Sequence, residues 1–142
     1  MKTSARNQFL GQVNAIRIGA VNAEVDLTLN NHQLITASIT KESAEKLAIR
    51  LNMSVIAWIE ASQIVVVSDF GDYQISARNQ LTGTIVNLNN NNISAEVVLS
   101  LAGGDTLTAS ISTDSLETLG LRKGQEVTAI FKAGAVILLV PS

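Results

Sequence analysis

Apolar and polar residues alternate at every step along Val21–Leu29. This alternation predicts a β-strand with one buried face and one face in water. The segment Ile93–Leu101 alternates in the same way, except that Val98 stands where the first segment has Asp26. Two stretches that lie 72 positions apart therefore predict the same element.

The whole chain repeats with this spacing. A shift of 72 positions aligns Ser4–Val67 with Ser76–Leu139 without a gap, and 22 of the 64 aligned residues are identical. The same five residues, Ser-Ala-Arg-Asn-Gln, open both copies. A repeat of this kind indicates one structural module used twice. We predict a first module over residues 1–68, a linker over 69–75 and a second module over 76–142.

Each module is predicted to contain five strands. Besides the alternating segment, the first module has strand patterns around Phe9–Ala15 and Ile35–Ile39, with turn residues between neighbours. Two more strands are expected at Met53–Ala61 and Ile64–Val67, matched by Gln125–Ala133 and Val136–Val140. The closing strand is an apolar run rich in β-branched residues, which is typical of a strand buried on both faces.

One short helix is predicted between the third and fourth strands, over Lys41–Leu51. From Ala44 onward, apolar residues recur at i, i+3, i+4 and i+7, which is one stripe of a helix. Thr40 is placed to cap the first turn, and Gly124 stands where a glycine would end the helix of the second module. The pattern predicts a mainly all-β fold: a tandem pair of small OB-like five-stranded barrels, each with one short helix.

The size of the modules limits how they are stabilised. A module of roughly 65 residues buries too little surface to be comfortably stable alone. The chain has no cysteine and a single histidine, so disulfides and a Cys/His metal site are not available. We therefore expect modules to pack together within the chain and between chains, as a homo-oligomer.

Charge and hydropathy exclude several partners. The chain has 10 Lys and Arg against 12 Asp and Glu, a net charge of −2. It lacks the basic footprint that nucleic acid or an anionic membrane requires. No apolar run is long enough to span a bilayer, and no signal-peptide core follows Met1. The composition is typical of a cytoplasmic protein whose partners include neither nucleic acid nor membrane.

Catalytic groups are not predicted. The single histidine, His32, falls in a predicted turn opposite Gly104 of the other copy, so we interpret it as a surface residue. Without a second histidine no Ser-His-Asp triad can form. Glu24 and Glu96 occupy one repeat position and are expected to be solvated. Acidic residues are scattered, unlike those of a calcium loop. We expect no enzyme, no metal cation and no covalent cofactor.

Hydrogen-bond donors open both modules. Ser4, Arg6 and Asn7 recur as Ser76, Arg78 and Asn79. A hydroxyl, a guanidinium and an amide together suit a small oxyanion, whose oxygens accept several charge-assisted bonds. The alternative is that these residues form a turn or a surface ion pair. Their recurrence weakens this alternative, although repeat symmetry alone would also preserve a folding feature.

These motifs, in this order and twice over, resemble the molybdate-binding Mop family. The resemblance rests on Ser-Ala-Arg-Asn, Gly19–Val25, the Thr-Ala-Ser-Ile strand and Phe131–Ala133, and it extends from Ser4 to Val140. Two modules with nothing else are similar to the two-repeat molbindins. The resemblance implies OB-like barrels in a homotrimer that binds molybdate or tungstate at subunit and module boundaries, and stores or buffers the oxyanion in the cytoplasm.

The resemblance also implies two classes of oxyanion site. Sites at module and subunit boundaries would use Ser4, Arg6, Asn7, Ser76, Arg78, Asn79, Lys132 and Ala133, with the helix-start hydroxyls of Thr40, Ser43, Ser112 and Ser115 as lesser candidates. Sites near a three-fold axis would use Gly19, Ala20, Val21 and Asn22, with Ile93 and Ser94 in the second module. There, neutral donors from three chains would surround a tetrahedral dianion.

Two departures between the copies predict unequal sites. Where the second module has Lys132, the first has Glu60, whose carboxylate repels a dianion. Where the first module has Gly19–Asn22, the second has Asn91–Ser94. The asparagine that replaces the glycine can adopt a left-handed backbone only at some cost. We expect the sites that use the lysine and the first-module turn to be the stronger ones.

Two other classes of function remain open. A nucleic-acid-binding OB module needs a basic groove and stacking aromatics, whereas this chain has one Trp, one Tyr and three Phe. Trp58 aligns with Ile130 in the repeat, which favours a packing role. The second alternative is a structural or regulatory module that lacks an effector domain. Mop-like modules also occur attached to transporter ATPases and DNA-binding regulators, but this chain has no Walker motif.

Overall fold

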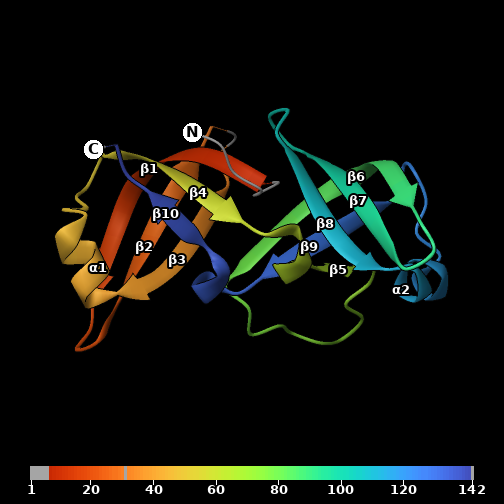
Figure 1. The fold of residues 1–142 in the computed structure, drawn as a ribbon, viewed down its shortest axis with the longest axis horizontal. Helices are drawn as coiled ribbons and strands as arrows, with labels where there is room; N and C mark the ends of the chain where they lie inside the picture. The colour runs from red at the N-terminus through yellow and green to blue at the C-terminus, as the bar shows by residue number, and fades with distance from the viewer. Residues whose placement is uncertain (1–6, 31, 142) are drawn as a thin grey trace.

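The chain forms two five-stranded antiparallel sheets side by side, each with a short helix at its outer end (Figure 1). A computed structural model describes residues 7–30 and 32–141. In chain order the elements are β1 (Asn7–Ile18), β2 (Asn22–Leu29), β3 (Leu34–Thr40), α1 (Lys41–Lys46), β4 (Ser54–Ile59), β5 (Val65–Val67), β6 (Asn79–Asn90), β7 (Ser94–Leu101), β8 (Thr106–Ser112), α2 (Thr113–Leu119), β9 (Glu126–Phe131) and β10 (Ile137–Leu139). This architecture confirms the predicted fold class.

Each sheet takes its fifth strand from the other module. The strand order is β10-β4-β1-β2-β3 in the first sheet and β5-β9-β6-β7-β8 in the second. Ile137 of β10 lies opposite Trp58, and Val65 of β5 lies opposite Ile130. In Figure 1 the blue β10 accordingly runs along the red-to-yellow sheet. The two modules are therefore interlocked, although the repeat pattern fits either pairing because both copies carry an equivalent strand.

The alternating segments fold as their pattern predicts. In β2 the side chains of Ala23, Val25, Leu27 and Leu29 are buried, and the intervening residues from Glu24 onward are half-buried. The equivalent apolar residues of β7 are buried in the same way. Each buried row packs into one hydrophobic cluster that includes side chains of both sheets.

The first helix is shorter than predicted. It ends at Lys46, whereas the apolar stripe extends to Leu51. Ala48 has a left-handed φ of 51°, which a continuing helix does not permit, and Leu51 is exposed. The start is as predicted, because Thr40 Oγ1 accepts a hydrogen bond from the Ser43 N–H at 3.0 Å.

The glycine that ends the second helix is Gly120, and the prediction of Gly124 is wrong. Gly120 has a φ of 61° and caps α2, while Gly124, with a φ of 87°, lies in the turn that follows. Their counterparts in the first module, Ala48 and Asn52, adopt the same backbone without a glycine, with φ of 51° and 69°. Both modules therefore use one turn geometry after the helix.

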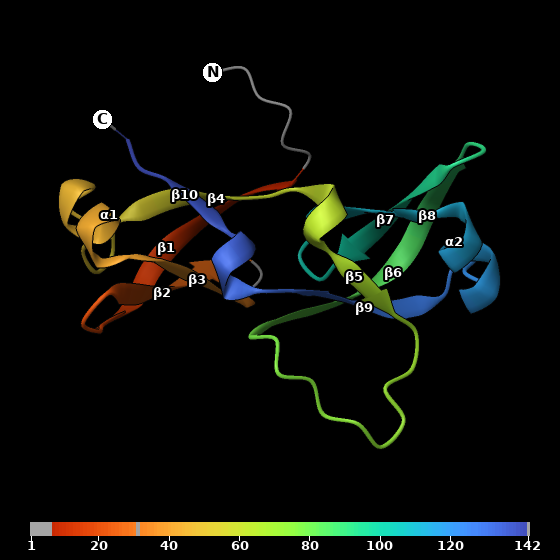
Figure 2. The same ribbon diagram turned by 60° about the horizontal axis from the view of Figure 1, so that its bottom comes forward.

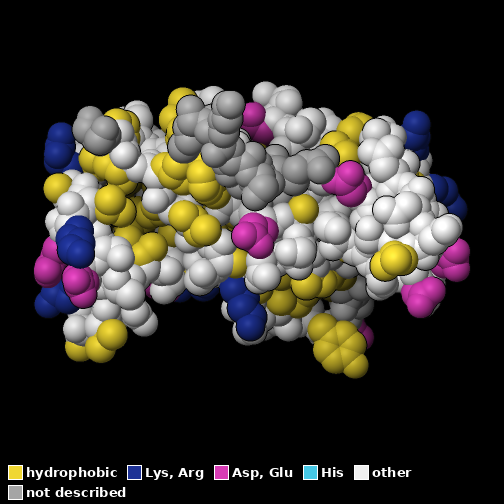
Figure 3. All heavy atoms as spheres, viewed as in Figure 1, with side chains coloured by type: hydrophobic (Ala, Val, Ile, Leu, Met, Phe, Trp, Pro, Cys, Tyr) yellow, Lys and Arg dark blue, Asp and Glu magenta, His cyan; other side chains and the backbone are white. Residues whose placement is uncertain are grey.

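The closing strands are not buried on both faces, contrary to the prediction. Val65 of β5 is 59% exposed and Ile137 of β10 is 52% exposed. Apolar side chains gather on the face over β10, β4 and β1 (Figure 3). There Leu10, itself 57% exposed, is part of a shallow apolar hollow of about 290 Å³. Trp58, half-buried between Gln8 and Ile137 across the sheet, has the packing role that the repeat favours.

Two buried asparagines join the modules at the open edges of the sheets. Asn79 Oδ1 accepts a hydrogen bond from the Thr36 N–H at 2.8 Å, and Asn79 Nδ2 donates to the Thr36 carbonyl at 2.8 Å. Asn7 does the same with Thr108, at 2.7 and 2.8 Å, and also donates to the Ile59 carbonyl at 3.1 Å. Thr36 and Thr108 lie on the edge strands β3 and β8, so each carboxamide acts as a one-residue extension of the opposite sheet.

Candidate anion-binding sites

One pocket brings four nominated residues together. Ser76, Arg78, Lys132 and Ala133 line a hollow of about 280 Å³ at the boundary between the modules. The first two precede β6 and the last two follow β9, and these antiparallel strands are neighbours in the second sheet. Residues far apart in sequence therefore meet at one end of two neighbouring strands. No carboxylate pairs with the exposed Lys132 in the part of the chain that the structure describes.

Arg78 connects this pocket to the first module. Its Nη1 donates to both carboxylate oxygens of Glu24, at 3.3 and 3.0 Å. Its Nε and Nη2 have no acceptor among residues 7–30 and 32–141, and the side chain is 51% exposed. Arg78 is therefore anchored on one side while the remaining N–H groups stay available to a ligand.

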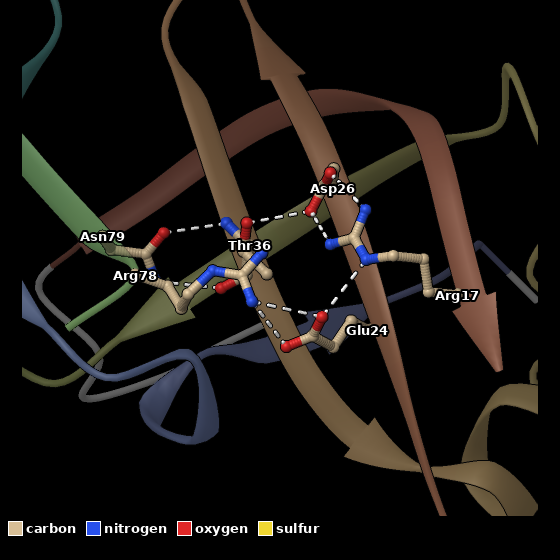
Figure 4. A network of polar contacts seen from close by, with 6 residues as sticks. All are labelled: Arg17, Glu24, Asp26, Thr36, Arg78 and Asn79. Atoms are coloured by element: carbon tan, nitrogen blue, oxygen red, sulfur yellow. Dashed lines mark hydrogen bonds and ion pairs between the residues drawn. The ribbon is translucent and has the colours of Figure 1, made fainter. Parts of the chain in front are cut away.

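The anchor belongs to a longer polar network (Figure 4). Glu24 also accepts a hydrogen bond from Arg17 Nε at 3.2 Å, and Arg17 donates two bonds of 2.8 Å to Asp26. Thr36 Oγ1 donates to Asp26 at 2.8 Å, and the Thr36 backbone pairs with Asn79. The expectation that Glu24 is simply solvated is therefore wrong.

Charge pairing within the network sets the ionisation of its members. Hydrogen bonds from Arg17 lower the pKa of Asp26, and they outweigh the partial burial that raises it. A further hydrogen bond from Thr36 acts in the same direction. The same contacts with Asp26 and Glu24 raise the pKa of Arg17. Both groups therefore stay charged at neutral pH and hold the strand face that receives Arg78.

Sequence reasoning missed this network, although the repeat contains a signal for it. Arg17 and Asp26 of the first module align with Asn89 and Val98 of the second. Both charges are lost together, as expected of two residues that pair with each other. The Arg17–Asp26 pair is therefore particular to the first module.

The turn between β1 and β2 contains the residues nominated for a three-fold axis, Gly19, Ala20, Val21 and Asn22. The Gly19 N–H donates to the Asn22 carbonyl at 2.8 Å, and the Lys41 N–H donates to the Val21 carbonyl at 2.8 Å. The N–H groups of Val21 and Asn22 find no acceptor in the described part of the chain. Gly19 and Asn22 line a hollow of about 410 Å³. We name residues 19–22 the first tip.

The equivalent turn, residues 91–94, is named the second tip. It keeps both backbone bonds, because the Asn91 N–H donates to the Ser94 carbonyl at 3.0 Å and the Thr113 N–H donates to the Ile93 carbonyl at 3.1 Å. Here, however, Asn91 Oδ1 accepts hydrogen bonds from the N–H groups of Ile93 and Ser94, both at 2.9 Å. Neither Gly19 nor Asn91 has a positive φ, so the expected left-handed backbone is wrong.

The remaining nominated residues are not gathered into these pockets. Thr40 and Ser43 bond each other through their hydroxyls at 2.8 Å, and so do Ser112 and Ser115, at the starts of the two helices. The side chains of Asn7 and Asn79 are 1% exposed and already bonded to backbone, so we assign them a structural role. Ser4 and Arg6 lie outside the described residues.

Two other kinds of site are missing from residues 7–30 and 32–141. In that part of the chain, no three His, Asp or Glu side chains come together as metal ligands would. No helix there is long and apolar enough to cross a membrane.

Comparison with known proteins identifies the modules. A model of the TOBE domain matches residues 3–66 and again 75–138. The chain is 44% identical over 140 residues to the molybdenum transport protein ModE of Herbaspirillum seropedicae, covering 99% of the chain and 52% of that protein. It is 38% identical over 141 residues to the molybdenum-pterin-binding protein MopA of Rhodobacter capsulatus, covering 99% and 53%. The chain thus spans about half the length of these curated relatives.

A solved structure matches over the full length. The cytoplasmic molybdate-binding protein ModG, in a crystal form with molybdate bound, superposes with a TM-score of 0.97 at 41% identity. The match covers 99% of this chain and 100% of that chain. The chain therefore belongs to the TOBE domain family, as a tandem pair of Mop-type modules, which confirms the family that the sequence indicated.

Proposed function

We propose that this protein binds molybdate or tungstate in the cytoplasm and stores or buffers the oxyanion without catalysing a reaction. The observation that carries the proposal is the pocket in which Ser76, Arg78 and Lys132 meet. It joins a hydroxyl and two cations, the donors nominated from sequence, in a chain whose fold matches a molybdate-bound protein over its full length.

The pocket chemistry suits a tetrahedral dianion. Charge-assisted hydrogen bonds from a guanidinium and an ammonium are roughly twice as strong as neutral ones. Arg78 is held in place by Glu24 and does not have to be ordered when the anion binds. Ala133 has no side-chain donor, so its contribution would be its backbone N–H at the start of the 3₁₀ turn Ala133–Ala135.

We further propose that the functional unit is a homotrimer in which a neighbouring chain completes each site. The row of Leu10, Ile56 and Leu139 lies on one face of three paired strands, and Leu10 is 57% exposed there. Burial of such a row against a second copy would add the apolar area that small modules lack. A neighbour would also bring the hydroxyls of its helix starts toward the pocket.

The alternatives receive less support. A nucleic-acid groove needs many cations, whereas this pocket has two and the chain carries a net charge of −2. A regulatory role without ligand binding gives no role to Lys132, which has no carboxylate partner among the described residues.

Native mass spectrometry with molybdate, tungstate and sulfate tests the proposal. We expect a trimer that takes up several molybdate or tungstate ions and no sulfate. Lys132→Ala should lose the boundary ions, whereas Lys123→Ala, an exposed lysine that does not line the pocket, should keep the full number. A protein indifferent to all three anions, or a Lys132→Ala variant with the wild-type number of ions, would contradict it.

A further inference from the structure

The two tips share one backbone and differ in one side chain. Corresponding backbone hydrogen bonds fix both turns, at 2.8 and 2.8 Å in the first tip and at 3.0 and 3.1 Å in the second. The same two N–H groups are therefore presented at both tips. At the first tip these are the N–H groups of Val21 and Asn22, and at the second those of Ile93 and Ser94.

Only the second tip already contains an acceptor for these donors. Asn91 Oδ1 accepts from both N–H groups at 2.9 Å, as one oxygen of a bound anion would. Gly19, at the same repeat position, has no side chain to do this. The second tip is also braced, because Thr113 Oγ1 donates to the Asn91 carbonyl at 2.9 Å.

We propose that the Asn91 carboxamide permanently occupies the second tip, so that of the two tips only the first binds an oxyanion. This inference rests on the proposed function and specifies which of its two turn sites is used. An anion at the second tip would have to displace an acceptor that is covalently attached and already in place. At the first tip Gly19 has no side chain to accept these hydrogen bonds, so the two N–H groups can bind an anion.

The charged residues around the two tips also favour binding of an anion at the first tip. The hollow of about 640 Å³ beside the second tip is lined by the carboxylate of Glu60, and no described Lys or Arg is among its lining residues. The hollow beside the first tip is lined by Glu24 as well as Arg17, and the Glu24 carboxylate is paired with Arg17 and Arg78. An incoming dianion therefore meets repulsion at the second tip in addition to the occupied donors.

The two tips are interchangeable by substitution. A Cβ added to Gly19 would lie 3.2 Å from the Asn22 carbonyl, a tight contact that a shift of a few tenths of an ångström relieves. The second tip shows that the same turn accommodates an asparagine. Gly19→Asn should therefore close the first tip, and Asn91→Gly should open the second.

Native mass spectrometry of molybdate-loaded wild type, Asn91→Gly and Gly19→Asn tests the inference by counting bound ions per assembly. We expect Asn91→Gly to gain one tip-bound ion, Gly19→Asn to lose one, and the double variant to return to the wild-type count. Asn91→Ala removes the acceptor without adding glycine flexibility and should also gain an ion. Asn14→Ala, at an exposed position of β1 outside both tips, should leave the count unchanged.

The outcomes separate this inference from the function on which it rests. If wild type binds molybdate but neither Asn91→Gly nor Asn91→Ala gains an ion, the inference is overturned and the proposed function stands. If no variant binds molybdate, both are overturned. Amide NMR provides a second readout: molybdate should shift the N–H signals of Val21 and Asn22 and leave those of Ile93 and Ser94 in place, and equal shifts at both tips would overturn the inference.

Discussion

Replacement of Asn79 by alanine is expected to destabilise the fold strongly, even though Asn79 was nominated from sequence as an anion ligand. Its carboxamide makes two hydrogen bonds of 2.8 Å to the Thr36 backbone, and its side chain is 1% exposed. The variant would leave the Thr36 N–H and carbonyl without partners at the edge of the first sheet. The effect is on folding, because the removed contacts join one module to the other.

The magnitude follows from the two orphaned groups. A buried N–H or carbonyl that loses its partner costs about 1–3 kcal/mol. Two such groups set a range of about 2–6 kcal/mol, and water that enters the space left by the carboxamide favours the lower half of it. For a chain of this length, a loss of about 3 kcal/mol lowers the melting temperature by on the order of 10 °C.

Thermal and urea denaturation, followed by circular dichroism at one fixed protein concentration, measure this loss. Asn14→Ala is the matched control, since Asn14 is exposed on β1 and makes no side-chain hydrogen bond within residues 7–30 and 32–141. We expect the control within about 0.5 kcal/mol of wild type. An Asn79→Ala variant as stable as the control would refute the role of the carboxamide as a clamp between the modules.

Three further variants probe the backbone and the charge network. Ala48→Gly should stabilise the protein by about 1 kcal/mol in urea denaturation, because Ala48 has a left-handed φ of 51°. Gly83→Ala should destabilise it by about 1–3 kcal/mol and more than Gly11→Ala, because the added Cβ would lie 2.7 Å from a backbone oxygen at Gly83 but no closer than 3.1 Å to any atom at Gly11. Hydrogen bonds from Arg17 lower the pKa of Asp26 in the folded protein. The charged Asp26 therefore stabilises the fold fully above its unfolded-state pKa of about 4, and this stabilisation is lost as pH falls through its lower pKa in the folded state. Asp26→Asn should therefore lose less stability than wild type between about pH 4 and pH 2 in acid titrations of the unfolding transition.

The local parts of the fold could be predicted from the sequence because they depend on periodicity. The alternation along Val21–Leu29 gives the buried face of β2, and Thr40 caps its helix as expected. The end of α1 could not be predicted in this way. Ala48 has high helix propensity, yet it adopts the left-handed backbone for which the other module uses a glycine.

The exchange of closing strands was beyond the sequence for a different reason. β5 and β10 are equivalent by repeat, so pairing within a module and pairing across modules bury the same kinds of side chain. The choice depends on the direction of the chain after the 3₁₀ turns Ala61–Gln63 and Ala133–Ala135, which no residue pattern reports. The long segment between β5 and β6, visible as a loop in Figure 2, then joins the edge strand β5 to β6 within the second sheet.

A residue that is identical in the two copies is therefore not necessarily a ligand-binding residue. Asn7 and Asn79 are identical because each pairs with the edge strand of the other module, and this requirement is symmetric. Two of the pairs at which the copies diverge line hollows at the surface. Gly19 and Asn91 lie at the two tips, while Glu60 lines the hollow beside the second tip and Lys132 lines the boundary pocket.

A folding requirement would keep such pairs alike, since the backbone around them is the same in both modules. Their divergence changes only what each surface offers to a ligand: free N–H groups or an internal acceptor, a cation or a carboxylate. The interlocked sheets allow this specialisation, because each boundary is built from both modules and a substitution in one copy alters one boundary alone. Duplication of the module thus supplies the scaffold, and the diverged pairs make its two halves chemically distinct.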